Sequence, residues 1–142
     1  MPLRFAQTLR ESRAQALVAA IDAAAGAGYF NFYTGVQPAT PETATDGSHT
    51  LLGTVTCSVN SATVATAGGV TSTTFDTFTA DSSADATGLA SWARLFDGDD
   101  TVVADFTCGG VGSGANLELT PTAQVYAGGS LNISSLVISE AA

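Results

Sequence analysis

The sequence contains no lysine, and its basic residues are four arginines against thirteen acidic residues. Charged residues make up 12% of the chain, which is about half of the usual share of roughly 25%. The lack of lysine excludes Schiff-base catalysis and a lysine-bearing phosphate loop. The net charge of −9 repels polyanions, so we expect no nucleic-acid partner for the main part of the chain.

Histidine and cysteine are also scarce. His49 is the single histidine, and Cys57 and Cys108 are the only cysteines, with no CxxC spacing. No serine lies in a GxSxG motif, so we interpret His49 as a loop residue rather than a catalytic base. The two cysteines are interpreted as free thiols, with one disulfide between strands as the alternative. We predict no catalytic residue, no metal ligand set and no cofactor.

Long apolar runs are missing as well. No run approaches the about 20 residues that a membrane-spanning helix needs. The alanine-rich N-terminal segment is similar to a signal peptide only in part, because Asp22 interrupts its apolar run and Glu11 lies ahead of it. We therefore expect neither a cleaved leader nor a membrane partner.

Residues 4–25 carry the one pattern typical of a long helix. Good helix formers fill this segment, and the glycines at 26 and 28 supply a stop signal. At about 100° per residue, one face gathers the apolar residues Phe5, Leu9, Ala16, Leu17, Ala20, Ile21 and Ala24. Arg13 falls inside this stripe. In one interpretation its aliphatic stem covers the edge of the core. In the other, the apolar stripe meets a partner chain, and Arg13 pairs with an acidic residue there.

The remaining sequence is typical of short strands separated by turns. We predict strands in segments 29–35, 51–59, 87–96, 101–108, 115–120, 123–129 and 130–139, one or two weak strands in 60–87, and a long surface loop in 36–49. This pattern predicts a mainly β chain, a jelly-roll-like antiparallel β-sandwich with one N-terminal α-helix. We predict a single domain over residues 1–142, with 1–28 as a helical arm and 29–142 as the β-sandwich body.

The acidic segment Asp97-Gly98-Asp99-Asp100 lies between two of the predicted strands. Its spacing departs from a calcium-binding EF-hand loop, and no glutamate follows at the required position. Asp-Gly between two alternating strands is a strong hairpin signal. We therefore predict a hairpin tip, in which Gly98 supplies a positive φ and the acids are solvated.

Trp92 and Arg94 alternate onto one face of the predicted strand 87–96. In one interpretation Trp92 anchors the core and Arg94 covers the sheet edge. In the other, both are exposed and form an interface hot spot, since Trp and Arg dominate such spots. We predict five candidate residues for a partner interface. Three lie in the N-terminal segment and two in the strand 87–96: Arg4, Arg10, Arg13, Trp92 and Arg94.

Several segments, in their order along the chain, resemble a group of small virion proteins of tailed bacteriophages. After an arginine-bearing, alanine-rich helix come YFNFYTGVQPATPETA (29–44), LLGTVTCS (51–58), ATGLASWARLFDGDDTVVADFTCGG (86–110) and YAGGSLNISSLVIS (126–139). Within that group the chain is most similar to capsid cement (decoration) proteins of short-tailed phages. The resemblance supplies no functional residues that can be transferred to this chain.

The resemblance implies a structural protein without enzymatic activity. Such a protein has a jelly-roll-like fold, often pairs as a homodimer, and sits on the phage head, where it bridges neighbouring major capsid proteins. Its expected location is the virion, assembled in the cytoplasm of the bacterial host. Two alternatives remain at this point: a structural protein of the phage tail or fibre, and a carbohydrate-binding module that uses an exposed Trp92.

Overall fold

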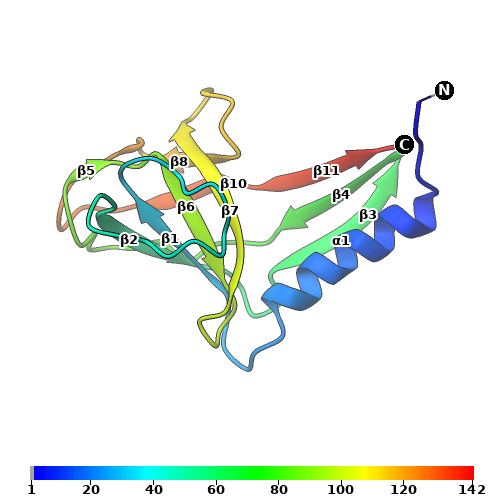
Figure 1. Cartoon of the computed structure of the whole chain (residues 1–142), viewed down its shortest axis with the longest axis horizontal. Coiled ribbons are helices and arrows are strands. Elements are labelled where there is room, and N and C mark those ends of the chain that lie inside the picture. The colour runs from blue at the N-terminus through cyan, green and yellow to red at the C-terminus, as the bar shows by residue number, and fades with distance from the viewer. Residues whose placement is uncertain (1) are drawn as a thin grey trace.

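The computed structural model describes residues 2–142, which form one helix and eleven strands in two regions (Figure 1). The first region, the body, contains β1 (Tyr29–Tyr33), β2 (Leu51–Thr56), β5 (Gly88–Leu89), β6 (Trp92–Phe96), β7 (Val102–Gly110), β8 (Leu117–Thr120), β9 (Gln124–Val125) and β10 (Asn132–Ser135). The second, the arm, contains α1 (Gln7–Ile21), β3 (Ala62–Ala67), β4 (Val70–Phe75) and β11 (Val137–Ala141). The predicted mainly β sandwich with one N-terminal helix is confirmed.

The body is built on a curled six-stranded sheet with the order β10-β8-β7-β6-β1-β2. Its pairs are antiparallel except β7 and β8, which run parallel and so depart from the strictly antiparallel prediction. An isolated bridge joins Thr79 to Thr56 of β2, and a second joins Asp81 to Leu131, next to β10. This short segment therefore links the two edges of the sheet and closes it around the core.

The alternation in β1 explains why this strand lies near the centre of the body. Phe30 and Phe32 are fully buried, and the ring of Phe30 lies 5.6–6.4 Å from four other phenylalanine rings, measured between centroids. Two of these rings belong to Phe75, at the end of β4, and to Phe106 in β7. One aromatic core therefore fills the body and reaches the base of the arm.

The arm sheet has the order β11-β4-β3, and α1 packs along β3 and β4 on one of its faces (Figure 1). β3 and β4 form a regular hairpin in the segment where only weak strands were expected. Its two-residue turn, Gly68-Gly69, has φ values of 57° and 79°, which suit a type I′ turn. The predicted helical arm is therefore backed by three strands that come from distant parts of the sequence.

The face that α1 turns to the sheet differs in part from the predicted apolar stripe. Arg10 and Ile21 are 3% and 0% exposed, whereas Leu9 is 44% exposed and Ala16 and Ala20 are also exposed. Backbone carbonyls at the tip of the arm accept hydrogen bonds from Arg10 and so allow its burial. The 15-residue α1 is the one helix of the described residues, and none there has the length and apolar character needed to cross a bilayer.

Candidate interaction surface

Trp92 is fully buried in the body. Its ring stacks on Tyr33 at a centroid distance of 4.7 Å and meets His49 edge-on at 5.2 Å. The indole Nε1 donates a hydrogen bond to the carbonyl oxygen of Thr34 at 3.3 Å. Burial of Trp92 contradicts the exposed alternative, but the ring lies on the face of β6 opposite the core side chains Ala93 and Leu95. Arg94 does not cover the sheet edge, because β6 lies between β7 and β1.

Arg94 is buried next to Trp92, with its guanidinium carbon 5.3 Å from the centroid of the indole ring. Its Nε and Nη2 donate to the two carboxylate oxygens of Asp105 at 2.7 and 2.8 Å, and Nη1 donates to the carbonyl of Thr43 at 2.8 Å. The hydrogen bond to Asp105 raises the pKa of Arg94 further, against the opposing effect of burial. The guanidinium holds the loop of residues 36–49 onto the sheet.

The loop of residues 36–49 covers Trp92 and Arg94. His49 Nε2 lies 2.8 Å from the carbonyl oxygen of Val36, and Nδ1 accepts a hydrogen bond from the backbone N–H of Asp46. These contacts fold the loop over the outer face of β6. The carbohydrate-binding alternative required an exposed Trp92, and the burial of this side chain removes its basis.

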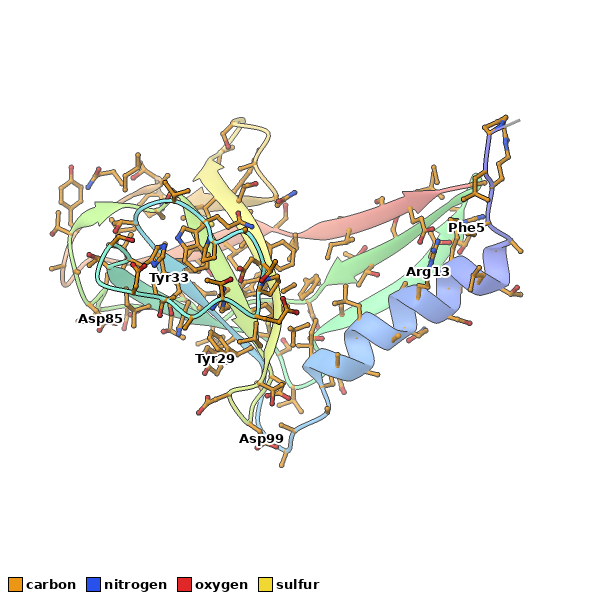
Figure 2. The ribbon with its side chains drawn as sticks, in the orientation of Figure 1. Phe5, Arg13, Tyr29, Tyr33, Asp85 and Asp99 are labelled. Carbon is orange, nitrogen blue, oxygen red and sulfur yellow. The ribbon has the colours of Figure 1, made fainter. Side chains whose placement is uncertain are left out.

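The segment 97–100 forms the tip of the β6–β7 hairpin, as predicted (Figure 2). Asp97 Oδ1 accepts hydrogen bonds from the backbone N–H groups of Asp99 and Thr101 at 2.9 Å. The prediction for Gly98 was wrong, because the positive φ of 65° belongs to Asp100. The prediction that the acids are solvated was wrong for Asp97, which is buried. A Cβ on Gly98 would lie 2.3 Å from the carbonyl oxygen of Gly26, so this glycine is required for a close approach of two backbones.

Burial shifts the pKa values of three titratable side chains in the body, Tyr29, Cys57 and Cys108. Burial, followed by the hydrogen bond to Asp100, raises the pKa of Tyr29 to about 12. Both cysteines are free, and burial raises the pKa of the Cys57 thiol to about 12 and that of Cys108 also upward. Within residues 2–142, no three His, Cys, Asp or Glu side chains lie close enough together to hold a metal ion.

Comparison with known proteins gives no relative: no family model, no curated protein and no solved structure matches this chain.

The three N-terminal arginines lie in α1 or just before it, in different environments. Arg4 is exposed. Arg10 is buried and donates to the carbonyls of Phe5 and Gly69. Arg13 forms an ion pair with Glu140 of β11 and lies over the ring of Phe5, 4.2 Å from its centroid (Figure 2). Arg10 and Arg13 therefore connect parts of the arm to one another, and their role at a partner interface remains a prediction.

Charge separates the arm from the body. The four arm elements contain two arginines and two glutamates, Arg10, Arg13, Glu11 and Glu140, and so have no net charge, while Arg4 adds one positive charge just before α1. Residues 22–61 and 76–136 contain eleven acids and a single arginine, a net charge of −10. The body therefore repels acidic surfaces, whereas the arm does not.

The exposed surfaces of the arm are uncharged over much of their area. On α1, Leu9, Ala16 and Ala20 face solvent. On the sheet face opposite α1, alternation exposes small residues of all three strands, among them Thr63, Ala65, Ala67, Thr74, Val137, Ser139 and Ala141. Sequence reasoning missed this surface, because threonine and alanine alternation offers no contrast in hydrophobicity between the two faces of a strand.

Proposed function

We propose that the protein is a structural component of a bacteriophage head that binds the outer surface of the capsid and bridges neighbouring major capsid proteins. The observation that carries the proposal is the neutral arm, which projects from a strongly acidic body and offers an uncharged helix surface. Leu9, Ala16 and Ala20 on this surface have no covering segment among residues 2–142.

Two further points support the proposal. Small side chains allow close approach to another protein, and little polar surface must be desolvated when they are buried. Weak contacts also suffice for a protein that binds at many equivalent positions of a shell, since linked contacts reinforce one another. The order of segments from YFNFYTG to LNISSLVIS, which resembles capsid cement proteins, points to the same class of protein.

Location in the particle is the first test. Phage particles are disrupted, heads and tails are separated, and the protein is quantified by mass spectrometry relative to the major capsid protein. We expect it in the head fraction at a fixed ratio to the capsid subunit. Recovery with tails instead would support a structural protein of the tail or fibre, and absence from particles would refute both.

The docking surface is the second test. Ala16→Glu places a charge on the exposed side of α1, away from the residues that contact the sheet. We expect lower occupancy on purified heads at an unchanged melting temperature. Ser82→Glu is the matched control, because it adds the same charge at an exposed position of the body. Equal occupancy of both variants would show that α1 does not bind the shell.

A further inference from the structure

β11 is an edge strand of the arm sheet, and one side of its backbone has no partner. Its pairing with β4 includes hydrogen bonds from Phe75 N–H to Leu136 O and from Ala142 N–H to Gly69 O. Even-numbered residues of β11 therefore point their backbone groups toward β4, because these groups alternate in direction along an antiparallel strand. The N–H and C=O groups of Val137, Ser139 and Ala141 point outward, and the described residues supply no hydrogen bond to them.

A groove lies between α1 and the edge strand β11. α1 packs on β3 and β4 and leaves a groove of about 160 Å³ between itself and β11. The groove is lined by Ala14 and Leu17 of α1 and by Ile138 and Glu140 of β11, together with Arg13. A strand added next to β11 would place every second side chain at the mouth of this groove.

The edge also lacks the features that usually prevent pairing. Exposed edges are commonly protected by lysine, proline, a bulge or an inward-pointing charge. β11 has neither lysine nor proline, and its pairing with β4 shows no shift in register. Its single acid, Glu140, is neutralised by Arg13 of the same chain.

We propose that two copies of this chain form a dimer in which β11 pairs with β11 of the second copy, antiparallel about a twofold axis at Ser139. In this register Ser139 exchanges two backbone hydrogen bonds with its counterpart. Val137 and Ala141 exchange four more, so all outward groups of the strand are paired. The two arm sheets become one continuous six-stranded sheet, with both copies of α1 on the same face.

The side chains on the groove side agree with this register. Ile138 lies opposite Glu140 of the second copy, so the two Ile138 side chains become diagonal neighbours near the axis. By the same register the two Glu140 side chains are also diagonal neighbours, and each keeps Arg13 of its own copy as its ion-pair partner. The groove side of the interface therefore combines apolar contacts with carboxylates that are already neutralised.

The self-complementary register of β11 favours a second copy as the occupant, and charge favours β11 over β3 as the edge. Two chains of net charge −9 repel each other, and contact through their neutral arms keeps the −10 bodies apart. The other edge of the arm sheet, β3, lies under α1 beside Glu11, whose Oε1 accepts a hydrogen bond from Thr66. Pairing through β3 would bring two copies of this carboxylate together without an exposed arginine beside them.

The dimer does not depend on the proposed function and is tested on the purified full chain. Sedimentation equilibrium over a range of concentrations should show a reversible dimer. Ser139→Pro removes an outward N–H while leaving the bonds to β4 intact, which an edge strand tolerates. We expect the dissociation constant to rise about tenfold or more, since two interface hydrogen bonds are lost and the ring obstructs pairing. Ser139→Ala, which loses the same side-chain contact to Ser72, should dimerise normally.

Amide hydrogen exchange of the wild-type chain tests the register without any variant. Under conditions where the dimer forms, the amides of Val137, Ser139 and Ala141 should become protected, and dilution should remove this protection. The even-numbered amides of β11, bonded to β4, should be protected at both concentrations. A monomer at every concentration, or a dimer in which the odd-numbered amides of β11 exchange freely, would overturn the proposal.

Discussion

The arm and the body are held together by different interactions. The body buries a cluster of phenylalanines around Phe30, together with leucines that are fully excluded from solvent. In the arm, the buried side chains between α1 and the sheet include Thr71, Thr73 and Arg10, each 2–3% exposed. Thr71 Oγ1 lies 2.8 Å from Thr66 Oγ1 and accepts a hydrogen bond from Arg10 Nε at 3.4 Å. The body is stabilised mainly by apolar burial. The arm is stabilised largely by hydrogen bonds and by the ion pair between Arg13 and Glu140.

This difference has consequences for stability. Burial of apolar surface contributes about 25 cal/mol per Å² to the free energy of unfolding. A hydrogen bond within the protein contributes only about 1 kcal/mol net, because it replaces hydrogen bonds to water. The arm also has only three short strands and one helix, with both outer faces open to solvent. We therefore expect the arm to open locally before the body unfolds.

Removal of the central aromatic ring of the body should have the largest effect. Phe30→Ala leaves a cavity among four phenylalanine rings, and we expect the free energy of unfolding to fall by about 3–5 kcal/mol. Urea denaturation measures the change. Val36→Ala, at a side chain that is 84% exposed, is the control and should change it by less than about 0.5 kcal/mol. If Leu17→Ala in the arm destabilised the chain as much as Phe30→Ala, the comparison would fail.

The ion pair buried in the body should be the next most sensitive. The Arg94 and Asp105 side chains are 4% and 2% exposed, so Arg94→Ala leaves a carboxylate without its partner. We expect a loss of about 3 kcal/mol, and Arg94→Lys should restore only part of it, because an ammonium group cannot make the two-pronged contact. The double variant Arg94→Met/Asp105→Leu should be more stable than Arg94→Ala. A loss below about 1 kcal/mol for Arg94→Ala would contradict a buried pair.

Sequence reasoning succeeded where large apolar residues alternate with polar ones. β1, β2 and β6 fall within predicted segments, β7 starts in one and runs two residues beyond its end, and the Asp97–Asp100 hairpin tip was placed correctly. In these strands the transfer of aromatic and branched side chains from water decides which face is buried, and the signal is local. The same reasoning gave little in the arm, where threonine, serine and alanine occupy both faces of β3 and β4.

Long-range contacts explain the remaining differences. Trp92 is covered by a loop that begins more than forty residues before it in the sequence, and alternation within β6 cannot show what lies over its outer face. The burial of Arg10 depends likewise on carbonyl acceptors at Phe5 and Gly69. The charge balance of the arm also needs distant segments, because Arg13 of α1 pairs with Glu140 of β11.

Alkaline pH should weaken the body more than the arm. The Cys57 thiol has a pKa of 9.0 when unperturbed and about 12 in the folded chain. Between these values the unfolded state loses the proton and the folded state keeps it, so the free energy of unfolding falls as pH rises. The expected slope is about 1.4 kcal/mol per pH unit for one such group. The raised pKa values of Tyr29 and Cys108 act in the same direction.

Urea denaturation under reducing conditions, from about pH 8 to about pH 10.5, measures this slope. Cys57→Ala should make it shallower, and Tyr29→Phe should do so only toward the upper end of the range. The groups of residues 2–142 with raised pKa values, Tyr29, Cys57, Arg94 and Cys108, all lie in the body. Amide exchange in the arm, corrected for its intrinsic pH dependence, should therefore change little. A pH-independent free energy of unfolding would refute the buried, neutral thiol.

The smallest effect is expected at the exposed ion pair of the arm. The side chains of Arg13 and Glu140 are 43% and 37% exposed, so solvent screens their attraction. Arg13→Ala should cost at most about 0.5 kcal/mol, and high salt should abolish the difference from wild type. Arg10→Ala removes a buried donor to backbone carbonyls and should cost about 1–2 kcal/mol at any salt concentration. If Arg13→Ala proved the more damaging variant, charge attraction rather than the hydrogen bonds of Arg10 would hold α1 to the arm sheet.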